Sequence, residues 1–223
     1  MKQHHRLQAA ILLFENFTAL DAVGPYEVLS RMPDTDVVFV GENTGQIRND
    51  TGSLGLAADA SLAEVPHPDL IVVPGGPGQN AHMSNGAVHQ WLRQADATSA
   101  WTTSVCTGSL ILAAAGLLTG KRATTHWLAL ETLGKYGARA TAERVVFDGK
   151  YVTAAGVSAG IDMGLALTGA IAGTQAAQGI QLGLEYDPQP PFAAGSPQTA
   201  PPAVVNALRA RKTTILGTSP AAL

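Results

Sequence analysis

Cysteine is nearly absent from this 223-residue sequence, which contains one, Cys106. A lone cysteine excludes an internal disulfide, and this fits a reducing compartment. The polar N-terminus is followed by too short an apolar stretch for a secretory signal. We therefore expect a cytoplasmic protein in which one free thiol has to be explained by its neighbours.

Long apolar runs and a strong excess of either charge are also missing. The longest apolar stretches, such as 9–14 and 110–118, are far shorter than the roughly 20 residues that cross a bilayer, so no membrane span is predicted. The formal net charge is −3, and the few basic residues form no broad surface, so nucleic acid is not an expected partner. Five histidines lack the spacing of metal ligands, so no metal site is predicted. They are His4, His5, His67, His82 and His89.

The pattern that is present is typical of an α/β protein. Apolar residues make up 46% of the sequence and charged residues 14%, which favours one compact, well-packed domain. Strand-like runs alternate with helical patterns, and this predicts a mostly parallel sheet with helices on both faces. Strands are predicted over 7–14, 36–40, 69–73 and 101–105, and helices over 18–29, 87–97, 110–118 and 127–136.

The C-terminal half departs from this alternation. Two strand-like runs flank Asp148-Gly149, a sequence typical of a tight turn, so 145–153 is predicted to form an antiparallel hairpin. Helices are expected over 158–172 and 175–186. Six of the sixteen residues in 187–202 are prolines, which predicts an extended arm, followed by a short helix over 204–212.

Three segments follow predicted parallel strands and should meet at the carboxyl edge of the sheet, where α/β proteins place their sites. They are the loop after Phe14 that leads to Asp21, the glycine-rich turn at 74–78, and the junction at 105–108 that contains Cys106. We expect these segments to converge on one active site.

Cys106 is the candidate nucleophile. A thiol at the start of a helix faces the positive end of the helix dipole, which predicts a lowered pKa and a reactive thiolate. The small residues Gly108 and Ser109 permit the tight turn that holds a nucleophile out of the sheet. The alternative is a buried, inert cysteine.

Three further candidates each have a functional and a structural interpretation, and both remain open. The Gly75-Gly76 turn could direct its N–H groups at a developing negative charge as an oxyanion hole, or it could simply end a strand. Asp21 could hydrogen-bond to Cys106 as the general acid and base, or it could stabilise the N-terminus of its helix. His126 competes with Asp21 as the partner of the thiol, or is a structural histidine.

At these residues the sequence resembles the ThiJ/PfpI superfamily, relatives of class I glutamine amidotransferases, and within it the bacterial isocyanide hydratases. The resemblance covers nearly the whole chain, which we interpret as one domain over 1–223 with a Pro-rich arm and short helix over 187–223. The motifs are Leu20-Asp-Ala-Val-Gly-Pro-Tyr-Glu-Val-Leu, Val73-Pro-Gly-Gly-Pro-Gly, Thr103-Ser-Val-Cys-Thr-Gly-Ser-Leu, Arg122-Ala-Thr-Thr-His-Trp, Ala159-Gly-Ile-Asp, and the tail from Gln181 to Pro197.

The resemblance implies a flavodoxin-like three-layer fold, a homodimer, no cofactor, and a hydro-lyase activity like that of cyclohexyl-isocyanide hydratase. In that reaction Cys106 attacks the terminal carbon of an isocyanide, and the resulting thioimidate is hydrolysed to an N-substituted formamide. Asp21 supplies the proton and then activates water, while Thr107 and the backbone of Gly76 orient the reacting groups. Many superfamily members have glutamate at the position of Asp21, and aspartate is expected of the hydratases.

Other functions remain open on the same residues. The chain could be another cysteine-dependent enzyme of the superfamily, amidase-like or glyoxalase- or deglycase-like, with His126 as the base. It could also be a redox-sensing protein in which Cys106 is oxidised. The segment 154–157 departs from the glycine-rich turn expected of the hydratases. No helix-turn-helix pattern follows the arm, which disfavours the DNA-binding regulators of the superfamily.

Overall fold

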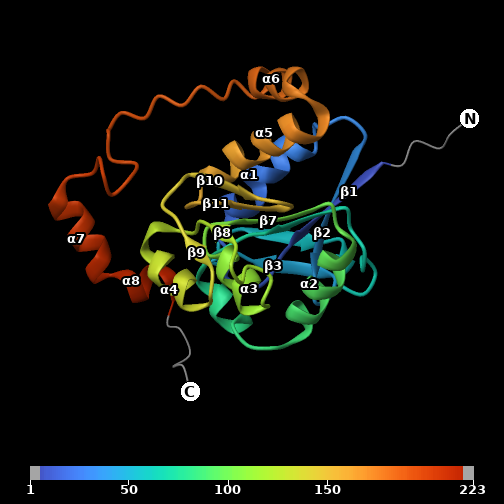
Figure 1. The fold of residues 1–223 in the computed structure, drawn as a ribbon, viewed down its shortest axis with the longest axis horizontal. Coiled ribbons are helices and arrows are strands. Elements are labelled where there is room, and N and C mark those ends of the chain that lie inside the picture. The colour runs from blue at the N-terminus through green and yellow to red at the C-terminus, as the bar shows by residue number, and fades with distance from the viewer. Residues whose placement is uncertain (1–5, 218–223) are drawn as a thin grey trace, which may run out of the picture.

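A seven-stranded sheet forms the centre of the protein in the computed structural model, which describes residues 6–217 (Figure 1). The strand order is β10-β11-β7-β6-β1-β2-β5, and every neighbouring pair is parallel except β10 and β11. The strands are β1 (Leu7–Leu12), β2 (Thr35–Gly41), β5 (Ala60–Ser61), β6 (Leu70–Val73), β7 (Trp101–Val105), β10 (Val145–Asp148) and β11 (Tyr151–Ala154).

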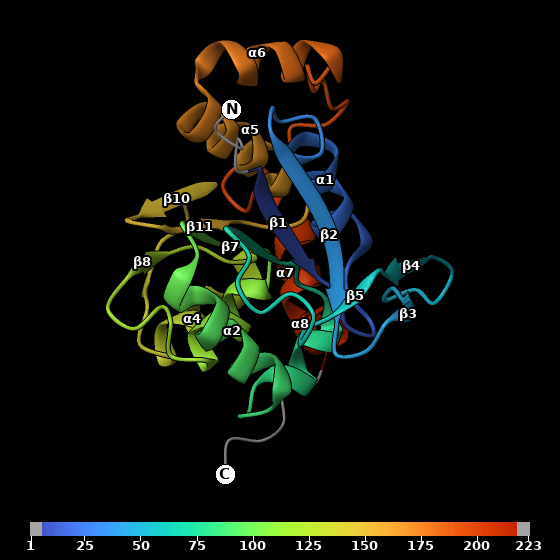
Figure 2. The same cartoon turned by 90° about the vertical axis from the view of Figure 1, so that its right-hand side faces the viewer.

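Helices cover both faces of this sheet, as Figures 1 and 2 show. One face carries α1 (Ala19–Leu29) and α5 (Ala159–Ala172), with α6 (Thr174–Gly183) outside them. The other carries α2 (Ala87–Thr98), α3 (Gly108–Ala114) and α4 (Leu130–Lys135). The predicted mostly parallel, three-layer fold with an antiparallel hairpin is therefore confirmed.

Short elements complete the chain. Two 3-10 helices, η1 (Pro77–His82) and η2 (Trp127–Ala129), follow strands of the central region. Two small sheets pair β3 (Gly45–Arg48) with β4 (Gly55–Ala58) and β8 (Arg122–Ala123) with β9 (Arg139–Ala140). The sequence pattern did not predict β5 or β9, because two-residue strands are too short to show a hydrophobic period.

The arm after α6 contains no helix or strand from residue 186 to residue 201, as its prolines predict. It leads to α7 (Pro202–Ala210) and α8 (Lys212–Leu216), which lie beside α4 in Figure 1. The side-chain amide of Asn80 donates a hydrogen bond to the carbonyl of Leu216 (2.8 Å) and so connects α8 to η1. The last six residues of the predicted arm, and His4 and His5, lie outside the described residues.

Close packing of α1 on α5 positions the first helix. A Cβ atom at Gly160 would lie 3.0 Å from Pro25 Cδ, and one at Gly164 would lie 2.9 Å from Val28 Cβ. Only glycine allows the two helices to approach this closely. The contact holds α1, and with it Asp21, firmly above the sheet.

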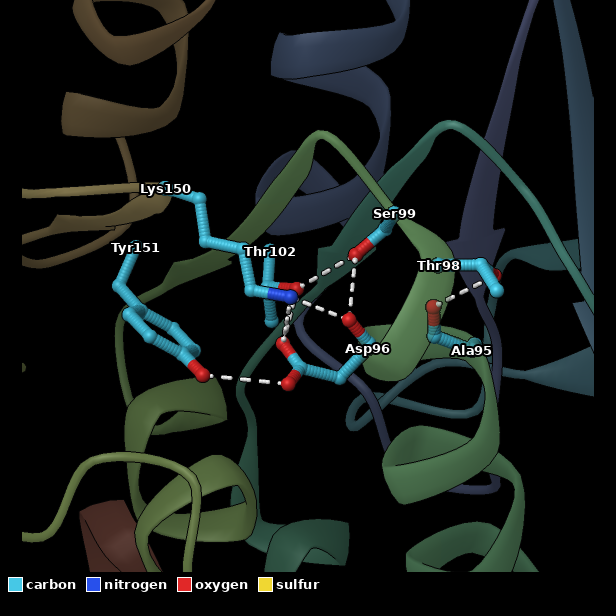
Figure 3. Close-up of polar contacts among 7 residues, drawn as sticks. All are labelled: Ala95, Asp96, Thr98, Ser99, Thr102, Lys150 and Tyr151. Carbon is cyan, nitrogen blue, oxygen red and sulfur yellow. Dashed lines mark hydrogen bonds and ion pairs between the residues drawn. The ribbon is translucent and has the colours of Figure 1, made fainter.

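A buried polar cluster connects α2 to the hairpin at the amino ends of β7 and β11 (Figure 3). Asp96 accepts hydrogen bonds from the hydroxyls of Thr102 (2.6 Å) and Tyr151 (3.1 Å). It also forms an ion pair with Lys150, whose Nζ lies 3.2 Å from Asp96 Oδ1. A buried carboxylate with a cation and two hydroxyl donors is electrostatically satisfied, so this cluster is a structural element.

Candidate active site

The three segments expected to converge do meet at the carboxyl edge of the sheet. They follow β1, β6 and β7, which are adjacent strands. The N–H of Gly75 donates a hydrogen bond to Asp21 Oδ2 (2.9 Å), and the N–H of Gly76 donates to Thr107 Oγ1 (3.0 Å). The Cys106 thiol hydrogen-bonds to the Asp21 carboxyl group. The structure therefore places Asp21, the glycine turn and the Cys106 junction in direct contact.

Cys106 has a strained backbone. Its φ is 56°, in the left-handed region that residues with a Cβ rarely adopt, at a cost on the order of 1–3 kcal/mol. Hydrogen bonds hold this conformation, because the Cys106 N–H donates to the carbonyls of Ala154 (3.1 Å) and Ala155 (2.9 Å), and Thr125 Oγ1 donates to the Cys106 carbonyl (2.9 Å). A Cβ at Gly108 would lie 2.0 Å from the Val73 carbonyl oxygen, so the turn requires glycine there. This is the sharp strand-to-helix turn predicted for a nucleophile.

The thiol itself is buried, with Cys106 4% exposed. Burial raises the pKa of the Cys106 thiol well above its usual value, and the negative charge of Asp21 raises it further. Backbone N–H groups of Val157 and Thr107 donate to the sulfur and oppose this rise without cancelling it. The prediction of a lowered pKa was therefore wrong: α3 is short, and loss of hydration outweighs the dipole of its N-terminus.

Asp21 is fully buried in the first turn of α1. Burial raises the pKa of Asp21 to about 7, and the hydrogen bonds from Gly75 and Cys106 only partly oppose this rise. Among the described residues, no N–H or O–H group donates to Asp21 Oδ1. A carboxyl group that titrates near neutral pH beside a thiol can both accept and donate a proton.

Gly76 and Thr107 directly follow Gly75 and Cys106 in the sequence and contact each other in the site. Gly76 has φ 128°, and a Cβ there would lie 2.5 Å from the N atom of Thr18, so the position requires glycine. Its N–H is directed at the Thr107 hydroxyl, which is buried next to Cys106. In this arrangement Gly76 orients the hydroxyl of Thr107.

His126 lies outside the Cys106–Asp21 pair. Its Nδ1 accepts a hydrogen bond from the N–H of Leu128 (3.3 Å) at the start of η2. Burial alone lowers the pKa of His126, with no contribution from Cys106 or Asp21. Its contact with the site is indirect, because the adjacent residue Thr125 donates to the Cys106 carbonyl.

A cavity of about 510 Å³, which was not predicted from the sequence, is lined by residues that contact Cys106, although Cys106 and Asp21 themselves do not line it. Its walls come from four regions of the sequence: residues around η2, the segment before β10, the segment after β11, and the C-terminal arm with α7. The lining residues are Thr124, Thr125, His126, Trp127, Leu130, Ala142, Arg144, Ala155, Gly156, Val157, Ser158, Gly195, Ser196, Pro197, Gln198 and Arg209. Nothing in the local sequence indicates that these regions meet.

Within residues 6–217, no group of three or more His, Cys, Asp or Glu side chains could hold a metal ion. In the same range no helix is long and apolar enough to cross a membrane.

Comparisons with known proteins agree with this geometry. A sequence model described as the DJ-1/PfpI family matches residues 7–170. An isonitrile hydratase of Pseudomonas putida is 45% identical over 92% of this chain and 90% of its own. A crystal structure of a THiJ/PfpI family protein from Pseudomonas syringae superposes with a TM-score of 0.90 at 34% identity, covering 97% of this chain and 91% of that one. The structure of DJ-1beta from Drosophila melanogaster, at 24% identity and a TM-score of 0.72 over 80% of this chain and 97% of that one, shares the fold.

Proposed function

The chain belongs to the DJ-1/PfpI family, and from that premise we propose that it is an isocyanide hydratase, a hydro-lyase that converts R–N≡C and water into R–NH–CHO. The observation that carries the proposal is the buried pair of Asp21 and Cys106, in which a carboxyl group of pKa about 7 hydrogen-bonds to a strained, buried thiol. The similarity to the Pseudomonas putida isonitrile hydratase, over nearly the full length of both chains, supports the same activity.

The first half of the reaction follows from the proton distribution in this pair. Because the thiol pKa is raised, Cys106 holds a proton at neutral pH while Asp21 is partly ionised. Asp21 accepts the thiol proton as the sulfur forms a bond to the terminal carbon of the isocyanide. It then donates this proton to the same carbon, which gives the thioimidate R–N=CH–S. The Thr107 hydroxyl, oriented by Gly76, positions the reacting group.

The second half returns the enzyme to its starting state. Ionised Asp21 removes a proton from water as its oxygen bonds to the thioimidate carbon, and this proton passes to the nitrogen. The carbon–sulfur bond then breaks as the new hydroxyl proton returns through Asp21 to the sulfur. The products are the formamide and the free Cys106 thiol, and no redox step or cofactor is required.

Cyclohexyl isocyanide and purified protein test the proposal. We expect wild type to form N-cyclohexylformamide and Cys106→Ala to form none. His126→Ala should keep its kcat, because no hydrogen bond joins His126 to Cys106 or Asp21, while its KM can rise because His126 lines the neighbouring cavity. Absence of product with wild type, or equal rates with Cys106→Ala, would reject the hydratase. Loss of activity in His126→Ala together with retention in Asp21→Asn would assign the acid–base role to the histidine.

We propose in addition that the protein acts as a homodimer in the cytoplasm. Leu182 of α6 and Phe192 of the arm are 78% and 76% exposed, and large apolar side chains exposed to this extent favour a protein interface. A free thiol nucleophile also suits a reducing compartment. Sedimentation equilibrium checks the first point: a wild-type dimer that dissociates in Leu182→Glu is expected, and a monomeric wild type would contradict it.

A further inference from the structure

Three residues that line the cavity also contact Cys106. Thr125 donates to the Cys106 carbonyl, Ala155 accepts from the Cys106 N–H, and Val157 donates its N–H to the sulfur. A volume of about 510 Å³ lies within the usual range of small-molecule sites, roughly 300–1,000 Å³. An isocyanide group is linear, so a substrate whose terminal carbon reaches the sulfur extends its R group away from Cys106, and this cavity is the space available.

The side chains that line the cavity carry positive charge and no negative charge. Its walls include two guanidinium groups and no Asp or Glu. Arg144 is already neutralised by an ion pair with Asp162. Arg209, from α7, lies over the ring of Trp127 at 5.9 Å and has no ion pair with any described residue. A cation–π contact with an aromatic ring leaves the guanidinium charge unneutralised.

One lining residue, Thr124, has a hydroxyl group without a hydrogen-bond partner among the described residues. Thr124 is fully buried. A buried polar atom without a partner costs free energy in the folded protein.

Resting on the proposed hydratase function, we propose that this cavity selects isocyanides whose R group carries a carboxylate, and that Arg209 binds this carboxylate. A guanidinium is planar and can form two parallel hydrogen bonds to a carboxylate, a strong and specific pairing. Arg209 is thus a specificity-determining residue that acts on the substrate's R group and has no part in the chemistry at Cys106. Because Gly195 to Gln198 of the arm complete the wall, the C-terminal arm is part of the substrate site.

Matched substrates test this assignment. We expect wild type to hydrate 4-isocyanobenzoate with a kcat/KM roughly tenfold above that for its methyl ester, a difference of about 1.4 kcal/mol. In Arg209→Gln the KM for the carboxylate should rise roughly tenfold with kcat little changed, and Arg209→Lys should recover part of this loss. The values for the ester and for cyclohexyl isocyanide should stay as in wild type.

The matched control is Arg211→Gln, which removes the same charge two residues away at a position that does not line the cavity. Equal effects of Arg209→Gln and Arg211→Gln, or no preference of wild type for the carboxylate over the ester, would overturn the assignment. Such results, with cyclohexyl isocyanide still hydrated, would leave the hydratase proposal intact.

Binding without turnover keeps the two proposals separate. The formamide 4-formamidobenzoate needs no catalysis, and calorimetric titration should show that it binds wild type roughly tenfold more tightly than Arg209→Gln. If wild type hydrates no isocyanide but shows this binding difference, the hydratase proposal fails while the carboxylate site stands. If 4-formamidobenzoate does not bind wild type, the carboxylate site is refuted.

Discussion

Asp21 and Asp96 are both buried carboxylates, but they lie at opposite ends of the sheet and have opposite surroundings. Asp96 pairs with Lys150 and accepts hydrogen bonds from Thr102 and Tyr151, as Figure 3 shows. Asp21 has no ion-pair partner among the described residues. Its donors are the N–H of Gly75 and the thiol of Cys106.

The difference in surroundings fits a structural role for Asp96 and the acid–base role proposed for Asp21. Lys150, Thr102 and Tyr151 all bind the Asp96 carboxyl group, so this residue holds α2 against the hairpin. Burial raises the pKa of Asp21 to about 7, and the hydrogen bonds from Gly75 and Cys106 only partly oppose the rise, so its proton can be exchanged near neutral pH. Burial is common to both residues, and the supply of donors and cations distinguishes them.

The largest effect is expected when the reactive carboxylate is neutralised. Asp21→Asn keeps the size of the side chain and removes the proton acceptor, so hydration of cyclohexyl isocyanide should fall about 10²–10⁴-fold. Thermal unfolding monitored in parallel should show no loss of stability, since no cation is left unpaired. A variant that unfolds more easily and keeps its turnover would place Asp21 with Asp96 as a structural residue.

The next effect concerns the free energy of unfolding, which should depend strongly on pH because of Asp21. The pKa of Asp21 rises from 3.8 in the unfolded chain to about 7 in the folded protein, so the folded state binds the extra proton between these values. Asp21 therefore lowers the free energy of unfolding as pH rises from about 4 to about 7, by an amount on the order of 4 kcal/mol. The raised pKa keeps the Cys106 thiol protonated over this range.

Urea unfolding between pH 5 and pH 8 checks this, with Asp21→Asn as the control. The variant should lose the part of the slope that Asp21 causes and should be more stable than wild type at pH 8. Parallel slopes for the two proteins would mean that Asp21 is not the group whose pKa is raised.

Neutralising Asp96 should lower stability and leave activity unchanged, which is the reverse of the outcome expected for Asp21→Asn. Asp96→Asn leaves Lys150 without its anion, and because the lysine side chain is 30% exposed, the free energy of unfolding should fall by about 2 kcal/mol rather than by the full value for a buried pair. Activity per folded molecule should stay near wild type, since the cluster is at the amino ends of the strands. Chemical denaturation and steady-state rates on the same samples separate the two effects.

The smallest effect is expected from Tyr151→Phe. It removes one hydroxyl donor and leaves Asp96 with Thr102 and Lys150, so stability should fall by about 1 kcal/mol with activity unchanged. A loss as large as that of Asp96→Asn would show that Tyr151, and not Lys150, holds the carboxylate in place.

Much of the fold could be predicted from the sequence because its signals are local. The buried run of β6, the Asp148-Gly149 turn and the prolines of the arm each indicate their structure within a few residues. Signals in the residues next to Cys106 likewise predicted that it lies at a tight turn between a strand and a helix. The Asp96–Lys150 pair could not be found in this way, because its members are 54 residues apart and neither has an unusual neighbour.

By itself, the sequence determined which residues stand after parallel strands, and therefore that Asp21, Gly76 and Cys106 share one edge of the sheet. Only the tertiary structure decided the direction of the thiol pKa, the exclusion of His126 from the reacting pair, and the closure of a cavity by the arm and Arg209. The physical reason is that a helix or a turn depends on near neighbours, whereas desolvation and pocket shape depend on atoms that only folding brings together.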